Sequence, residues 1–562
     1  MRPRAAMPVI REFNLMSASP SPVAPPLDVA CGDPINGGDY CGDSTTLHVS
    51  SNDESTNGEA LAPGETVGLL SKPALVLYFQ SIVSTFMQNV LPPLKLYVFM
   101  AYLHSSADNY AQLTALENLA WSLRVLFALL SDYLPVFGHR RRFWLSLGWV
   151  ITCVSLAVMG FSSFGSPFCD PKDYPTCWNP KANTTKAAYD FGAPGRVAWY
   201  RIPTFFATLG VVLVAANVDG LMVEYAQREP IATRGQIQAV VYALTGTGGL
   251  AARFFIQLML NGKRYGGSYD WSVGANVPYL LSLGGGLVAL LTALVFVHDS
   301  PRPFVPFRQW LGGLWLLLTN RAVYQLLIFR FFYYLFNNVY GNPLLAFGIP
   351  LVRWVDDLDM GWINITPRLL FVPVTGYVGR TGLQWNWRYV AAGATGVNIA
   401  LMAFASFFVI YDVCRNAWFY TAVIVLTGAP VAINYLLQGL VMVELAGVGY
   451  EAMTAALWAT IKDLNVPIAL KWHSFITDQF PVKSMLLKDD DHTRNHVAST
   501  HAISFAIQFV GLAWFLLVPT QKLAMRALKH GAGSRLGGAV VVVGYFAMLV
   551  FLWQQNIDSY SN

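Results

Sequence analysis

Long apolar segments separated by short polar ones are the dominant pattern along this chain. A membrane-spanning helix needs about 20 apolar residues, and twelve stretches meet that requirement. The predicted spans are residues 74–103, 110–131, 143–163, 202–225, 236–260, 277–297, 322–346, 361–379, 389–411, 418–445, 450–474 and 497–519. A shorter apolar stretch at 537–553 is either a thirteenth span or an interfacial helix, and the pattern leaves both open.

The polar segments predict the domain organisation. Residues 299–321 separate six spans from six, and their part 309–318 is expected to lie flat at the membrane interface. The predicted domains are a disordered cytosolic tail at 1–72, a six-helix bundle at 73–298, a central cytosolic linker at 299–321, a second six-helix bundle at 322–520, and a cytosolic segment at 521–562 that holds the stretch 537–553. The expected fold class is an all-α polytopic membrane protein with two pseudo-symmetric bundles, an arrangement typical of secondary transporters.

The composition agrees with a chain that lies mostly in lipid. Of 562 residues, 54% are hydrophobic and only 12% are charged, whereas soluble domains carry about 25% charged residues. The net charge of +5 lies in loops beside apolar spans, which is typical of cytoplasmic-loop bias and not of nucleic-acid binding. We therefore expect the lipid bilayer, and no nucleic acid, as a partner.

Basic residues concentrate in alternate loops. Arg140–Arg142 and Arg234 lie on the same side as the N-terminal tail, and the positive-inside rule assigns that side to the cytosol. We expect a multi-pass plasma-membrane protein with a cytosolic N-terminus. The opposite side then holds Cys169 and Cys177, expected to form a disulfide, and a glycosylation sequon at Asn183, because both modifications require the outer or lumenal side.

A charged cluster at the inner end of the second span predicts a gate. An acidic residue closes the span, a short turn follows, and three arginines come directly after it. Such charges can hold neighbouring helices together on one side of the membrane. The predicted gating residues are Asp132, Gly138, Arg140, Arg141, Arg142 and Glu224.

Ionisable residues within the spans predict a substrate site, because each costs about 2.5–3.5 kcal/mol to insert. Glu117, Trp121 and Arg124 share one helical face by their spacing, which indicates a cavity lining; the alternative is a Glu117–Arg124 pair that neutralises itself. Asp219 has no local basic partner, so it is a candidate proton carrier, with a structural ion pair to another helix as the alternative. The predicted proton-coupling residues are Asp219 and Glu117.

Arginines within the spans suit an anionic substrate, because a guanidinium binds a carboxylate at two points. The alternative is that each arginine pairs with Asp219 or Glu451. Asparagine amides can read the edge of a heterocycle. The predicted substrate-binding residues are Glu117, Trp121, Arg124, Asp219, Arg253, Arg330, Asn337 and Glu451.

Several catalytic signatures are absent from the sequence. There is no Walker A loop, nucleophile elbow, zincin motif or Cys/His metal cluster, each of which would indicate a nucleotide, hydrolase or metal site. We therefore expect no enzyme activity, no cofactor and no metal.

Five motifs occur in a fixed order between residues 73 and 525. They are Trp121…Arg124…Ser131-Asp132…Pro135-Val136-Phe137-Gly138-His139-Arg140-Arg141-Arg142; Asp219…Val223-Glu224-Tyr225-Ala226-Gln227-Arg228-Glu229-Pro230…Arg234-Gly235-Gln236; Tyr265-Gly266-Gly267-Ser268-Tyr269-Asp270-Trp271-Ser272; Asn386-Trp387-Arg388; and Gly449-Tyr450-Glu451-Ala452. This set resembles the folate–biopterin transporters, a branch of the major facilitator superfamily. The segment 518–522 and the extra apolar stretch most resemble the protozoan members. Arg124 stands where the resemblance leads us to expect a lysine.

The resemblance implies a major facilitator fold and a secondary active transporter that works by alternating access. Its substrate would be a small molecule: folate, a pteridine such as biopterin, or S-adenosylmethionine. We favour folate or pteridines, taken up by a proton-coupled symporter, with S-adenosylmethionine as the alternative. A non-transporting membrane receptor or scaffold with the same fold is the alternative from another class.

Overall fold

The structure is a computed structural model that describes residues 60–170, 189–267, 269–297, 299, 305–339, 360–363, 365–480 and 489–561. By internal contacts the chain divides into residues 1–54 and 55–562, and the description below concerns the second unit. Most of the predicted tail at 1–72, as well as Cys177 and Asn183, lies outside the described residues.

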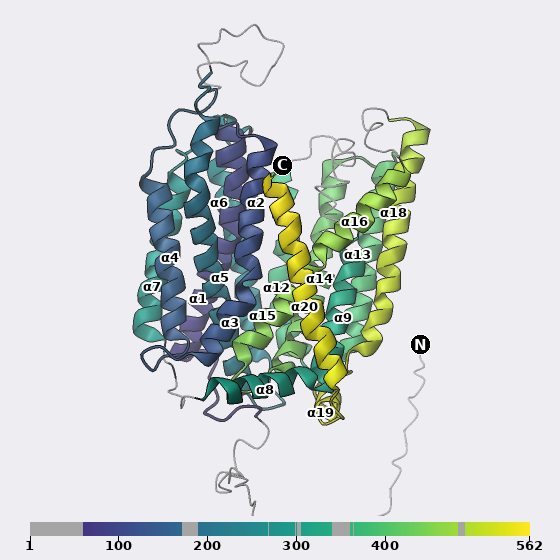
Figure 1. Ribbon diagram of the computed structural model, residues 1–562. Helices are drawn as coiled ribbons and strands as arrows, with labels where there is room; N and C mark the ends of the chain where they lie inside the picture. Colours follow the sequence, from purple (N-terminus) through teal and green to yellow (C-terminus); the bar gives the residue numbers. More distant parts are fainter. Residues whose placement is uncertain are drawn as a thin grey trace, which may run out of the picture. The chain divides into compact units, whose positions relative to one another are not determined.

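The first half of the chain forms packed helices (Figure 1). They are α1 (Lys72–Leu94), which continues as the π-helix η1 (Lys95–Tyr102), α2 (Ala107–Ser122), α3 (Arg124–Tyr133), α4 (Arg142–Phe161), η3 (Pro194–Arg196), α5 (Val197–Gln227), α6 (Gln236–Leu260), η4 (Lys263–Tyr265) and α7 (Val277–Phe296). A Cβ on Gly148 of α4 would lie 2.9 Å from the carbonyl oxygen of Gly210 in α5. The two backbones therefore touch, which small residues permit between membrane helices.

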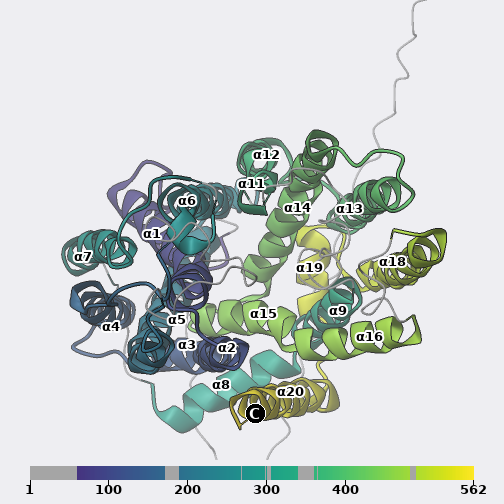
Figure 2. The same ribbon diagram turned by 90° about the horizontal axis from the view of Figure 1, so that it is seen from above.

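The second half repeats this pattern of packed helices. Its elements are α8 (Phe307–Thr319), α9 (Arg321–Asn338), α11 (Met360–Ile363), α12 (Pro367–Thr381), α13 (Trp387–Ile410), α14 (Ala417–Leu445), α15 (Glu451–Leu464), α16 (Val466–Gln479), α18 (Asp491–Gly511), η6 (Leu512–Leu517), α19 (Lys522–Lys529) and α20 (Arg535–Ser561). Seen along the helices, the two halves lie side by side (Figure 2). Helix α6 packs against α12, and α15 packs against both α3 and α5, so these helices join the halves.

The described helices differ from the predicted spans in three places. Ten are long and apolar enough to cross a membrane, or up to eleven if the bent pair α8–α9 is counted as one span. Helix α12, in the place of the predicted span 361–379, has only 15 residues. The predicted span 450–474 breaks at Asn465 into α15 and α16, because Pro467 lacks the N–H that a continuous helix needs. The predicted span 110–131 is interrupted at Leu123, between α2 and α3.

Two helices bear on questions that the sequence raised. Helix α8 is bent by 65° from α9, which agrees with the prediction that 309–318 lies flat. The stretch 537–553 falls within α20, whose residues Arg535–Ile557 are long and apolar enough to cross a membrane. Helix α20 runs alongside α2 and also contacts α9 and α15 (Figure 1). By length and composition α20 is a candidate span, and the choice between a thirteenth span and an interfacial helix stays a prediction.

Candidate functional site

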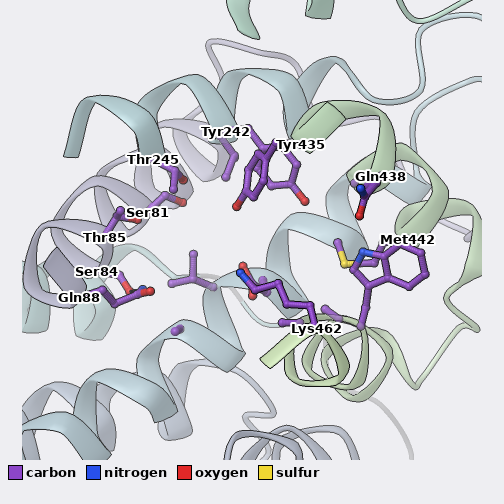
Figure 3. A pocket seen from close by; sticks show the side chains of 18 of the residues that line it. Ser81, Ser84, Thr85, Gln88, Tyr242, Thr245, Tyr435, Gln438, Met442 and Lys462 are labelled. Carbon is purple, nitrogen blue, oxygen red and sulfur yellow. Dashed lines mark hydrogen bonds between the residues drawn. The ribbon is translucent and has the colours of Figure 1, made fainter. Parts of the chain in front are cut away.

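A cavity of about 180 Å³ lies between the two halves. The first half lines it from α1, α3, α5 and α6, and the second half from α9, α14 and α15. Figure 3 shows hydroxyl and amide side chains of α1 on one side, the rings of Tyr242 and Tyr435 on another, and Lys462 below these rings. Its polar and charged side chains include Ser81, Ser84, Thr85, Gln88, Arg124, Asp219, Thr245, Arg330, Gln438 and Lys462.

Arg124 and Asp219 join α3 to α5 inside this cavity. Their side chains form an ion pair, with exposed fractions of 13% and 30%. The Arg124 guanidinium also lies 5.6 Å from the centre of the Trp121 ring, a distance typical of a cation–π contact. The pair matches the alternative in which Asp219 binds an arginine on another helix. It excludes the intrahelical Glu117–Arg124 pair.

Arg330 is the most deeply buried cation of the cavity. It donates one hydrogen bond to Gln438 Oε1 at 2.5 Å and another to the carbonyl of Trp458. Its guanidinium lies 4.3 Å from the Trp458 ring and 5.0 Å from the Tyr334 ring. Among the residues that the structure describes, Arg330 forms no ion pair. Its positive charge is therefore held by neutral groups and is available to an anion.

Lys462 adds a third cation that sequence reasoning did not place in the site. It lines the cavity, and its Nζ lies 3.8 Å from a carboxylate oxygen of Asp463. The lining thus carries Arg124, Arg330 and Lys462 against the carboxyl group of Asp219, a positive excess. The polar stripe of α1 was also missed. Its spacing of three, four and seven residues places it on one helical face, and that spacing could have revealed it.

Several predicted site residues lie away from the cavity. Glu117 is buried and pairs with Lys95 of η1. The prediction that Glu117 and Arg124 line the cavity from one helical face is therefore wrong for Glu117. Arg253 lies on α6 and does not line the cavity. Asn337 donates to the Tyr333 carbonyl at 2.9 Å. Glu451 lies at the inner end of α15, among the gating residues.

Four of the six predicted gating residues, Asp132, Arg140, Arg141 and Glu224, meet in one buried ion-pair network with Glu451. Arg141 contacts Asp132 at 2.5 Å and Glu451 at 3.3 Å, and all three side chains have 0% exposure. Arg140 contacts Glu224 at 2.9 Å and Glu451 at 3.2 Å. Because Glu451 belongs to the second half, these contacts hold the two halves together at the end that the charge pattern predicts to face the cytosol, here called the inner end. We call these five residues the inner latch.

Asp132 also caps a helix of the opposite half. Its carboxylate accepts hydrogen bonds from the backbone N–H of Met453 at 2.7 Å and of Ala452 at 3.4 Å. Both groups belong to the first turn of α15, where N–H groups lack partners within the helix. The turn that carries the latch depends on Gly138, whose φ of +76° is left-handed and favours glycine. Arg142 donates to the Leu294 carbonyl, outside the latch.

A second ion pair joins the halves near the latch. Arg234 contacts Glu444 at 2.9 Å, with exposed fractions of 1% and 2%. Lys522 donates to the carbonyls of Ile231 and Arg234 at 2.9 and 2.8 Å, and burial lowers the pKa of Lys522 to about 8. Burial also raises the pKa of Glu229 to about 7, although backbone N–H groups donate to its carboxylate.

The outer loops bear on the predicted modifications. Cys169 is buried and disulfide-bonded. The predicted partner Cys177 and the sequon at Asn183 lie outside the described residues, so the pairing and the glycan stay predictions. Within the described ranges, no group of three or more His, Cys, Asp or Glu residues is placed to hold a metal ion.

Comparison with known proteins confirms the resemblance and the fold. The BT1 family model matches residues 88–165. A folate-biopterin transporter of Synechocystis sp. is 23% identical over 213 residues, or 38% of this chain and 35% of that protein. The chain thus spans about a third of the length of this curated relative.

Two solved structures of XylE, a major facilitator superfamily protein, have a similar fold. The proton:xylose symporter XylE bound to 6-bromo-6-deoxy-D-glucose aligns with a TM-score of 0.54 at 14% identity, covering 82% of this chain and 98% of XylE. A double-tryptophan XylE mutant aligns with a TM-score of 0.53 at 13% identity, covering 81% and 98%. The chain is a multi-pass, all-α membrane protein with the major facilitator fold.

Proposed function

We propose that this chain, which joins a BT1-family segment to a major facilitator fold, is a secondary active transporter of folate and/or pteridines. It would work by proton-coupled alternating access in the plasma membrane, with its N-terminus in the cytosol. The observation that carries the proposal is the positively charged, aromatic-lined cavity between two halves that are held together at the inner side.

The charge of the cavity favours an anionic substrate. Arg330 forms no ion pair among the described residues, and a desolvated guanidinium binds carboxylates strongly. A folate carries carboxylates on its glutamate tail, and its flat ring can stack on Tyr242 or Tyr435. The sulfonium of S-adenosylmethionine would instead enter a lining with three cations and one carboxyl group. The lining therefore supports folate over that alternative.

The Arg124–Asp219 pair supports a coupling mechanism. A substrate carboxylate that binds Arg124 would displace Asp219. The released carboxyl group, now without its cation in a low-dielectric cavity, would take up a proton. Substrate and proton would then occupy the cavity together, and release on the inner side would restore the ion pair. Opening that side requires the inner latch to break.

The direct test is transport by purified protein in liposomes. Labelled folic acid, biopterin and S-adenosylmethionine are compared for uptake and counterflow. We expect exchange of folate and biopterin, and a loss of folate uptake of at least tenfold in Arg330→Ala, because one charge-assisted hydrogen-bonding group is lost. Arg330→Lys, which keeps the charge, should retain part of the uptake, and Arg253→Ala, outside the cavity, should retain all of it. Binding without exchange would identify a receptor and overturn the proposal.

Coupling is tested separately with Asp219→Asn. We expect the variant to bind folate but to lose the dependence of uptake on an imposed pH gradient. A variant that still accumulates folate in proportion to the gradient would remove Asp219 from the coupling step and leave the substrate assignment intact.

A further inference from the structure

A second cavity, of about 740 Å³, adjoins the central one. The two cavities share Gln88, Arg124 and Lys462 in their linings. The rest of the second lining comes from α2, from the break between α15 and α16, and from α20. We call it the side cavity. Because one set of side chains borders both spaces, a molecule in one of them contacts residues of the other.

The breaks in two helices leave room for the side cavity. The inner segments α3 and α15 pack against each other. The outer segment α2 ends at the interruption at Leu123, and the outer segment α16 begins after the interruption at Asn465. Helix α20 contacts both outer segments. Trp553 Nε1 donates to Ser122 Oγ of α2 at 2.9 Å, and the Phe551 ring lies 4.6 Å from Lys471 Nζ of α16. Helix α20 therefore forms a wall of the side cavity.

The lining of the side cavity is suited to carboxylates. Its cations are Arg124, Lys462 and Lys471, against the single carboxylate of Asp463. Asn556 of α20 accepts from Asn118 at 3.5 Å, while its own Nδ2 is buried and donates to no acceptor among the described residues. A buried donor without an acceptor costs about 1–3 kcal/mol, and a ligand carboxylate placed there would remove that cost.

The two volumes suggest how one ligand fills both spaces. Pockets for small molecules measure roughly 300–1,000 Å³. The central cavity, at about 180 Å³, is smaller than that range, and the side cavity, at about 740 Å³, lies within it. A compact ring can occupy the central cavity, while a longer ligand must extend past Arg124 and Lys462.

We propose that the two cavities form one bipartite site in which α20 takes part in substrate recognition. The ring of the substrate lies in the central cavity, and a carboxylate-bearing tail lies in the side cavity against Lys471 of α16 and Asn556 of α20. This inference rests on the proposed function. It assigns to the C-terminal helix a role in distinguishing substrates with an anionic tail from bare rings.

The test compares substrates that differ only in the tail. Initial uptake of folic acid, pteroic acid (which lacks the glutamate) and biopterin is measured in liposomes for the wild type, Lys471→Ala, Asn556→Ala and the double variant. We expect the KM for folic acid to rise about tenfold in each single variant, and the KM for biopterin to stay within about twofold. Val550→Ala, on an exposed part of α20, serves as the control and should change neither.

The outcomes distinguish a failure of the proposed function from a failure of the bipartite site. A wild type that transports neither folic acid nor biopterin overturns the proposed function, and the inference with it. A wild type that transports both, with variants that change folic acid, pteroic acid and biopterin equally or not at all, overturns the inference alone. Because Lys471 and Asn556 lie at a cavity and outside the packed core, melting temperatures near that of the wild type will show that the variants fold.

Discussion

The inner and outer ends of this protein use their charges differently. At the inner end, the ion pairs of Arg141 with Glu451 and of Arg234 with Glu444 are almost fully buried and connect the two halves. At the outer end, pairs such as Arg196–Asp190 and Arg415–Asp489 are partly exposed, and each lies within one half. The comparison teaches that, among the described residues, buried ion pairs connect the two halves at the inner end, whereas the pairs named at the outer end each stay within one half.

The largest expected effect comes from Asp132→Ala. This change leaves the fully buried Arg141 without its 2.5 Å partner and removes the acceptor for two N–H groups of α15. Breaking a buried pair costs about 3–5 kcal/mol, so we expect a large fall in melting temperature in detergent and loss of uptake. Asp190→Ala at the outer end should cost about 1 kcal/mol or less. Equal shifts for both variants would show that the two ends do not differ.

The next effect is a pH dependence specific to the inner side. The pKa of Glu229 is raised from 4.5 to about 7 by burial, so the folded protein keeps a proton that the unfolded chain has released in this window. The free energy of unfolding should therefore fall as pH rises from about 4.5 to 7. We expect this contribution to be about 1–3 kcal/mol, measured as melting temperature against pH.

Two variants test whether Glu229 causes this pH dependence. Glu229→Gln should remove the part of the slope that Glu229 contributes between pH 4.5 and 7. Asp190→Asn should leave it unchanged, because hydrogen bonds from Ser166 and Arg196 lower the pKa of Asp190, and its effect appears only as pH falls below its ordinary range. The lowered pKa of Lys522 acts above about pH 8. A slope in Glu229→Gln that equals that of the wild type would assign the titration to another group.

A smaller effect is expected at the turn that carries the inner latch. Gly138 has a φ of +76°, and a residue with a Cβ pays about 1–2 kcal/mol in that region. Gly138→Ala should therefore lower the free energy of unfolding by about that amount and reduce uptake. Gly195→Ala is the matched control, since nothing lies within 4 Å of its added Cβ. Similar losses for both variants would argue against a special role for the turn.

The smallest effect should come from Arg415→Ala at the outer end. Its contacts with Asp489 are partly exposed, and pairs of this kind contribute about 0.2–1 kcal/mol. We expect a shift near the limit of thermal measurement and normal folate uptake. A loss of uptake would show that the Arg415–Asp489 pair at the outer end is essential for transport. It would contradict the conclusion that the two ends use their charges differently.

The fold and most of the inner latch could be predicted because their signals are local, whereas Glu451, predicted as a substrate-binding residue, joins the latch from the other half. Apolar length marks most of the spans, and Asp132 with three following arginines marks the gate, since charge beside a span must lie outside the lipid. The break at Asn465 carries a weaker local signal in Pro467. The interruption at Leu123 has none that we recognise.

The members of the central cavity were harder to predict, because partners there come from distant segments. Glu117 has the right spacing for the cavity, yet it turns to Lys95, 22 residues earlier. The sequence around Arg253 is as apolar as the sequence around Arg330, but of the two only Arg330 lines the cavity. Which face of a helix meets the cavity depends on how that helix is rotated against its neighbours, and a single sequence does not record that rotation.

The cap that Asp132 places on α15 has a consequence for the assembly of the chain. The first turn of α15 receives part of its hydrogen bonding from a residue more than 300 positions earlier. The second half, produced alone, would have an incomplete helix end at its inner face, and it would regain that end only by docking with the first half. We therefore expect separately expressed halves to stabilise each other when they are brought together in one membrane.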